Sequence, residues 1–150
     1  MAILLSLALL LLVPAGTWRD PHARLAVSYP RGWHLTTREL TPITDPVERF
    51  AIYSGPLPRP LASPKARQVI AIVMEVKSPL PVTLAHFPKR PHHFRLSHLG
   101  LLEGFSGKRW GELTFRDHRR AFYVFIGVGS QSRAQLPQVL DALNSLRVGS

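Results

Sequence analysis

The stretch QVIAIVMEVK at residues 68–77 decides the fold. Its side chains alternate between two faces, and both faces are apolar. Because successive side chains of a strand point to opposite sides of the sheet, a strand that is apolar on both sides must be covered on both. The pattern therefore predicts a central β-strand over 68–77, with material packed on each face of its sheet.

A β-hairpin is predicted over 109–128. Two alternating segments flank Asp117-His118, which we expect to form a two-residue turn. That register places Arg116 directly opposite Arg119. It also produces one wholly apolar face: Leu113, Phe115, Phe122, Val124 and Ile126. The opposite face carries three aromatic side chains: Trp110, Tyr123 and Phe125.

Other short elements are predicted from the same kind of pattern. Alternating apolar residues indicate strands at 24–29, 33–38, 48–53 and 94–102. Prolines at four positions between Gly55 and Pro64 exclude a helix or a central strand there, so we expect a surface connection. One helical turn fits between later prolines, around 82–86.

The chain ends in a predicted amphipathic helix. Its apolar residues follow the i, i+3, i+4, i+7 spacing: Leu136, Val139, Leu140, Leu143 and Leu146. Ser132 and Gln135 could form a capping box, but Pro137 favours a start near Gln135. Strands followed by a terminal helix, without βαβ repetition, predict an α+β fold, an antiparallel sheet of about six strands packed by helices with the C-terminal helix on the sheet.

An apolar segment precedes this domain. Ala2 to Val13 are apolar except for Ser6, and small residues stand at −3 and −1 of a cut after Ala15. We therefore expect a signal peptide at 1–15, a linker at 16–23 and a single α+β domain at 24–150. The expected location is extracytoplasmic.

Two alternatives for the amino terminus stay open. Residues 1–15 could be an uncleaved membrane anchor, in which case the positive charges at Arg19, Arg24 and Arg31 would favour a domain on the cytoplasmic side. Alternatively, the start codon is wrongly assigned. A buried core helix is disfavoured, because nothing polar marks a solvent-facing side.

Two short motifs give a family resemblance. YPRGW at 29–33 lies between two predicted strands, and LNSLRV at 143–148 closes the terminal helix. In these motifs and in the order of its elements, the chain resembles PsbP-like domains, and more narrowly small exported proteins of actinobacteria. The resemblance implies an antiparallel sheet sandwiched by helices, used mostly as a non-catalytic accessory or binding module. It transfers no functional residue.

Positive charge is the most distinctive surface feature. The chain has 19 Lys plus Arg against 9 Asp plus Glu, a formal net charge of +10. Five cations bracket the hairpin and form the candidate patch for an anionic partner: Lys108, Arg109, Arg116, Arg119 and Arg120. An anionic partner would relieve the repulsion between opposed arginines. The aromatic face of Trp110, Tyr123 and Phe125 could then stack on bases or sugars.

The alternative for this hairpin is a solvated tip above a second buried layer. Among anionic partners, export favours lipid headgroups or wall polymers over nucleic acid.

No metal or phosphate motif is complete. Four histidines fall within 13 positions: His86, His92, His93 and His98. On a strand, His92 and His98 would be too far apart to share one zinc ion. The segment 104–108 lacks both ends of a P-loop, and 127–132 lacks the third glycine of a dinucleotide fingerprint, so each is predicted to be a turn. The chain has no cysteine, which excludes disulfides and thiolate metal sites.

Candidate catalytic groups are equally incomplete. Ser106 and Ser130 stand in no nucleophile elbow, and spacing alone cannot bring Glu75, Glu103 and Glu112 together. We therefore expect a non-catalytic, exported or membrane-tethered module without a cofactor, whose partner is another envelope protein. The alternatives are a binder of anionic lipid or polymer acting through 108–120, and a hydrolase whose site is assembled from distant residues.

Overall fold

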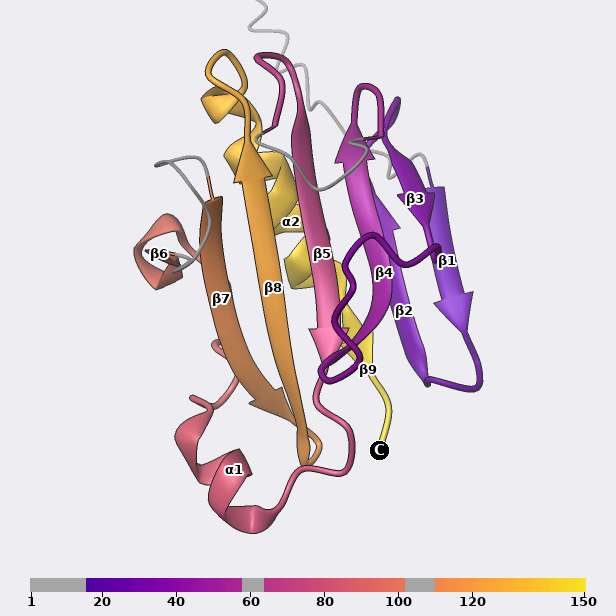
Figure 1. Ribbon diagram of the computed structural model, residues 1–150, viewed down its shortest axis with the longest axis vertical. Coiled ribbons are helices and arrows are strands. Elements are labelled where there is room, and N and C mark those ends of the chain that lie inside the picture. Colours follow the sequence, from indigo (N-terminus) through magenta and orange to yellow (C-terminus); the bar gives the residue numbers. More distant parts are fainter. Residues whose placement is uncertain (1–15, 58–63, 102–109) are drawn as a thin grey trace, which may run out of the picture.

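The fold of the computed structural model consists of two antiparallel sheets and a C-terminal helix (Figure 1). The structure describes residues 16–57, 64–101 and 110–150. The larger sheet has the order β3 (His34–Thr36), β4 (Val47–Ser54), β5 (Val69–Glu75), β8 (Arg120–Val128), β7 (Trp110–Asp117) and β6 (Gly100–Leu101). The smaller sheet has the order β1 (Gly16–Asp20), β2 (Leu25–Tyr29) and β9 (Arg147–Val148). The helices are α1 (Pro81–His86) and α2 (Leu136–Ser145), with 3₁₀ turns η1 (Leu96–His98) and η2 (Arg133–Gln135).

Strand β5 is central, as its sequence predicts. It pairs antiparallel with β4 on one side and β8 on the other, and all of its residues are buried. Val69, Ala71 and Val73 face one core, whereas the alternate residues Ile70 and Ile72 face a second core on the other side of the sheet. The expectation that both faces of this strand are covered is confirmed.

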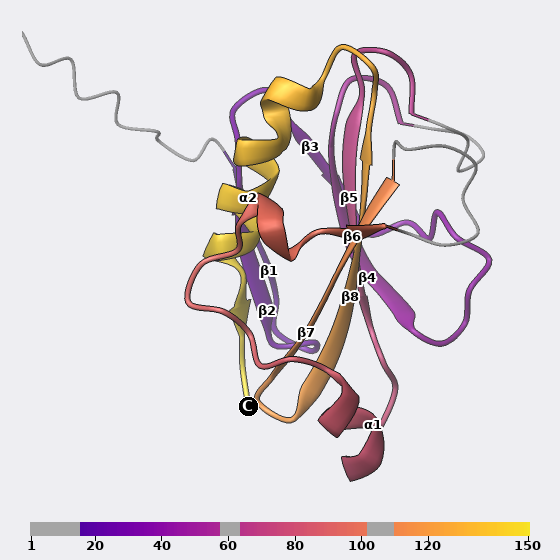
Figure 2. The same cartoon turned by 90° about the vertical axis from the view of Figure 1, so that its left-hand side faces the viewer.

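Helix α2 and the smaller sheet together form the layer on one face of the larger sheet (Figure 2). Val139 and Leu143 of α2 are fully buried in this core beside Leu25 and Val27 of β2. The helix begins after Gln135 with Pro137 in its first turn, so the predicted start is confirmed. The predicted helical turn near 82–86 is also confirmed, as α1.

The α+β class is confirmed, but the strands divide between two sheets instead of forming one. The predicted strand 24–29 becomes β2 and belongs to the smaller sheet, because β1 and β9 pair with it on either side. Residues 16–20, expected to be part of a linker, are strand β1. Its Trp18 packs on Phe50 of the larger sheet, with ring centroids 4.9 Å apart. Its sequence GTWRD has one large apolar residue, Trp18, so no alternating pattern marks it as a strand.

The predicted strand 94–102 is wrong over most of its length. Leu96–His98 forms the 3₁₀ turn η1, and only Gly100 and Leu101 pair with β7. The backbone N–H of Phe94 donates instead to Asn144 Oδ1 at the end of α2, at 2.7 Å. Arg90 strengthens this attachment by donating to the Leu143 carbonyl at 3.1 Å. These contacts with α2 hold the segment away from the sheet until Gly100.

The hairpin forms, but its register differs by two residues from the prediction. The turn is His118-Arg119, so that Asp117 lies opposite Arg120 and Arg116 lies opposite Ala121. The predicted pair of opposed arginines is therefore wrong. A two-residue shift leaves every side chain on its predicted face, and the pattern cannot distinguish the two registers. The apolar face from Leu113 to Ile126 joins the main core as expected.

An ion-pair cluster ties the three central strands together at the end near this turn. Glu75 of β5 accepts from Arg120 Nε of β8 at 2.6 Å and from Arg49 Nε of β4 at 2.7 Å. Arg120 Nη2 makes a further bond to Glu75 at 2.8 Å. Burial alone would raise the pKa of the Glu75 carboxyl, but the hydrogen bonds and charges of Arg120 and Arg49 hold that pKa below its ordinary value of 4.5.

This cluster makes stability depend on pH. A carboxyl whose pKa is lower in the folded state stabilises the fold above its unfolded pKa, and that contribution is lost as the pH falls. Glu75→Gln should therefore lower the free energy of unfolding by about 2–4 kcal/mol at pH 7. The difference from the parent should shrink as the pH falls below 4.5. Urea titrations at pH 7 and pH 3 measure both values.

Glu39→Gln is the matched control, because Glu39 is exposed in the loop after β3. It should change stability by less than about 0.5 kcal/mol at either pH. An equal loss in both variants, or a Glu75→Gln defect that is as large at pH 3 as at pH 7, would contradict the assigned role of the cluster.

Candidate functional site

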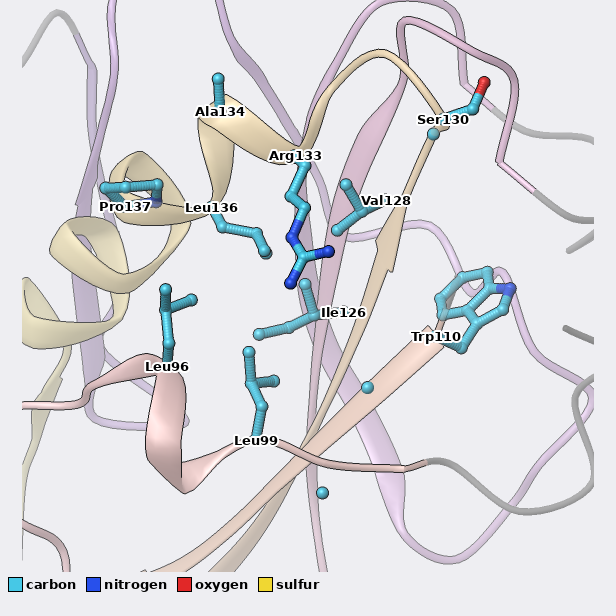
Figure 3. Close-up of a pocket in the computed structure, with 13 residues that line it drawn as sticks. Leu96, Leu99, Trp110, Ile126, Val128, Ser130, Arg133, Ala134, Leu136 and Pro137 are labelled. Carbon is cyan, nitrogen blue, oxygen red and sulfur yellow. The ribbon is translucent and has the colours of Figure 1, made fainter. Parts of the chain in front are cut away.

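An open pocket lies beside the larger sheet, between strands β7 and β8 and the segments η1 to β6 and η2 to α2 (Figure 3). Its volume is about 820 Å³. Most of the lining side chains are apolar: Leu96, Leu99, Trp110, Ile126, Val128, Ala134, Leu136 and Pro137. They come from four separate parts of the chain, so tertiary packing assembles the pocket.

The turn that joins β8 to α2 forms one rim of the pocket. Gly129 donates its N–H to the Gln68 carbonyl at 2.7 Å, and a Cβ at Gly129 would lie 1.8 Å from the Lys65 carbonyl oxygen. Ser132 Oγ donates to the Ala66 carbonyl at 3.0 Å. The prediction of a strand-to-helix turn at 127–132 is confirmed, and these bonds fix where Arg133 emerges.

Arg133 supplies the one ionisable side chain among the described residues that line the pocket. Its guanidinium extends from η2 into the hollow toward Ile126, whereas the hydroxyl of Ser130 points away (Figure 3). No ion pair holds Arg133 within the described part of the chain. A guanidinium keeps its charge at physiological pH and offers several donors to a carboxylate or phosphate. The site can thus hold an apolar molecule that carries an anionic group.

The structure describes three of the five cations of the candidate hairpin patch and gives them different surroundings. Arg120 is engaged by Glu75 and is mostly buried, so its charge is already balanced. Arg116 and Arg119 are exposed near the β7–β8 turn. Lys108 and Arg109 lie outside the described residues. The described patch is therefore smaller than the sequence predicts.

The candidate aromatic face belongs largely to the second core. Trp110 and Phe125 are 3% and 8% exposed and pack with Ile70, Ile72 and Met74. Their rings are therefore not presented for stacking on bases or sugars, and this arrangement matches the alternative of a second buried layer.

Tyr123, the third member of the aromatic face, is half-buried. Its ring meets Phe87 edge-on with centroids 5.0 Å apart. Burial raises the pKa of its hydroxyl, and the negative charges of Glu112 and Asp45 add to that shift.

The four clustered histidines lie on different elements. His86 ends α1, His92 and His93 follow in a loop, and His98 ends η1. The premise that His92 and His98 share a strand is wrong. Their ring contacts are local: His92 lies against His93 with centroids 4.3 Å apart, and His98 Nδ1 accepts from the Arg95 N–H at 2.9 Å. Within the described ranges, no three potential ligands gather around a common point.

The candidate acids do not meet either. Glu75 lies opposite Phe122, whose side chain is in the main core, whereas Glu112 lies opposite Phe125 of the second core. Directly opposed side chains share a face, so these two carboxylates point to opposite sides of the sheet. Glu103, Ser106 and the glycine-rich segment 104–108 lie outside the described residues.

Comparison of the chain with protein-family models and with curated protein sequences found no match. Within the part of the chain that the structure describes, no helix has the length and apolar character needed to cross a bilayer.

Sequence reasoning missed both Arg133 and the pocket. Nothing in the residues around Arg133 marks it, because Leu96 and Leu99, which form the opposite wall of the pocket, come from a segment more than 30 residues earlier in the chain. Recognising Arg133 as a pocket residue requires knowing how β7, η1 and α2 are placed relative to one another.

The indole of Trp110, which packs in the second core, constrains its neighbour on β8. A Cβ at Gly127 would lie 2.8 Å from the ring of Trp110, so Gly127→Ala must displace the indole. We expect it to lower the free energy of unfolding by about 1–3 kcal/mol in urea titration. Gly100→Ala, on the same side of the molecule, is the control, since the nearest atom to its Cβ would be 3.7 Å away. Equal stability changes in the two variants would show that Trp110 is not held in this position.

Proposed function

We propose that this protein is a non-catalytic binding module that takes an apolar ligand with one anionic group in the pocket beside α2. The observation that carries the proposal is the apolar hollow of about 820 Å³ with the guanidinium of Arg133 directed into it. Small-molecule sites in proteins are commonly about 300–1,000 Å³, mostly apolar, and oriented by a few polar groups. A long-chain carboxylate has the required combination of an apolar body and a single charge.

The lining residues favour binding over catalysis. General acid–base chemistry requires a group that gains and loses a proton near the working pH, and a guanidinium does not. The hydroxyl of Ser130 is turned away from the hollow (Figure 3). Among the described residues, the alternative of a hydrolase thus gains no support from this pocket. The resemblance of 29–33 and 143–148 to PsbP-like domains also supports an accessory or binding role, and an envelope protein remains the predicted partner.

The charge of Arg133 should determine which amphiphiles bind. Arg133→Gln should weaken the binding of dodecanoate about fivefold, since a partly exposed charged hydrogen bond contributes roughly 1 kcal/mol. Binding of dodecanol, which has the same chain without the charge, should change less than twofold. Isothermal titration calorimetry on the full chain measures both.

Two further variants complete this test. Arg147→Gln removes an exposed arginine on β9, remote from the pocket lining, and should leave both affinities unchanged. Ala134→Trp places a large ring at the pocket wall and should weaken both ligands. Retention of parental dodecanoate affinity in Arg133→Gln and Ala134→Trp alike would refute the ligand site.

We further propose that the module is exported and released by cleavage after Ala15, with tethering through 1–15 as the alternative. The first described strand, β1, begins at Gly16, which lies opposite Tyr29 of β2. A cut after Ala15 would therefore leave a mature chain whose first residue belongs to β1. Mass spectrometry of fractionated cells should find an amino terminus at Gly16 outside the cytoplasm. An intact Met1 in the membrane fraction would overturn the proposed release.

A further inference from the structure

We infer that the end of the molecule formed by α1 and the β7–β8 turn docks on an anionic lipid surface. Helix α1 and this turn project from the same end of the fold (Figure 1). A hollow between them is lined by residues of both, including Pro81, Leu84, Arg116 and Arg119. We call residues 80–86, Lys89 and residues 116–119 the docking end. The inference goes beyond the proposed pocket, which lies at the opposite end of β7 and β8.

The docking end carries positive charge that the described residues do not neutralise. Lys89, Arg116 and Arg119 are exposed, and none of the three is in an ion pair with a described acid. The acid in their midst, Asp117, is already engaged by Arg90 at 3.1 Å and by His118 at 2.9 Å. A local excess of cations therefore faces solvent.

Backbone hydrogen bonds hold two of these cations side by side. Arg116 donates its N–H to the Pro88 carbonyl at 2.8 Å, and its own carbonyl accepts from the Arg90 N–H at 3.0 Å. Lys89 thus forms a parallel bridge with Arg116. Like charges held side by side on neighbouring segments destabilise a fold when no anion lies near them. An anionic surface would convert this cost into attraction.

The turn itself departs from the most stable sequence. His118 and Arg119 both have positive φ, 45° and 62°, a conformation that Asn-Gly or Asp-Gly adopts with least strain. Arg119 is the less usual of the two, because glycine, Asn, Asp and His are the residues enriched at positive φ. This turn therefore presents the charge of Arg119 at the tip, where a glycine would give a more stable hairpin.

Apolar side chains complete the docking end and favour lipid over a soluble polyanion. Leu80 and Val82 are 65% and 63% exposed, and α1 buries none of its own residues. Apolar side chains flanked by cations are typical of segments that lie in the interface of an anionic membrane. A soluble polymer would use the charges but would give Leu80 and Val82 nothing apolar to enter. Exposed apolar side chains and cations at the same end of the molecule thus favour a lipid surface as the partner.

The docking end lies far from the point where the described chain begins. Strand β1 begins at Gly16, toward the end of the molecule opposite α1 (Figure 1). Docking through α1 therefore suits the form released by cleavage before Gly16. It also leaves the pocket beside α2 away from the membrane, so variants can affect the two sites independently.

Sedimentation with vesicles tests the inference. Full-length protein and its variants are mixed with vesicles containing either 30% phosphatidylglycerol or phosphatidylcholine alone, so that residues 1–15 contribute equally to every comparison. Arg116→Gln with Arg119→Gln should weaken binding to the anionic vesicles roughly 30-fold, at about fivefold per arginine near such a surface. Leu80→Ser with Val82→Ser should weaken it about tenfold. Added salt should weaken parental binding.

The control removes two exposed arginines elsewhere, Arg31→Gln with Arg67→Gln. Arg67 precedes β5 at the end of the sheet where β8 finishes, opposite the turn. This control should reduce anionic binding by no more than a few-fold, through net charge alone. A loss in the control equal to that in the Arg116 and Arg119 variant would overturn the inference. So would full vesicle binding by the Leu80 and Val82 variant, which would indicate an anionic polymer as partner instead. Dodecanoate binding should be unchanged in all of these variants, which separates this result from a failure of the pocket proposal.

Discussion

Burial of strand β5 on both faces is the constraint on which the rest of this structure depends. An all-apolar strand is stable only when each face is covered, and the chain meets this requirement in two different ways. On one face, α2 and β2 place Val139, Leu143 and Leu25 against the strand. On the other, Trp110 and Phe125 from the hairpin pack on Ile70 and Ile72. Aromatic side chains that suggest a stacking surface in the sequence are thus used in the core.

The same constraint places the two proposed binding surfaces at the ends of the sheet. Two of the described hollows lie at opposite ends of β7 and β8, where strands finish and loops begin. One such place is the pocket beside α2, where apolar residues of β7 and β8 meet Arg133. Another is the opposite end of the same two strands, where α1 meets the cationic turn. We regard β7 and β8 as a rigid spacer between two chemically different surfaces.

Charge on this protein divides into structural and available groups. Arg120 and Arg49 are engaged by Glu75, and Arg90 is engaged by Asp117 and by the end of α2. These cations hold strands and loops together and cannot serve a partner without loss of stability. The pairing of β5 with β8 brings Arg120 beside the buried carboxylate, whereas the hairpin turn at His118-Arg119 leaves Arg119 at the tip.

Local apolar periods predict the α+β class, the central place of 68–77, the hairpin faces and the terminal helix, and the structure has all four. They could not determine the division of strands between two sheets, since β1 has one large apolar residue and β9 has two residues in all. They also could not select the hairpin register, because a shift of two residues preserves both faces. Only the tertiary structure decided that Arg120 is paired, that Trp110 is buried and that Arg133 enters an apolar pocket. Each of these depends on contacts between segments far apart in the chain, and no local period records such contacts.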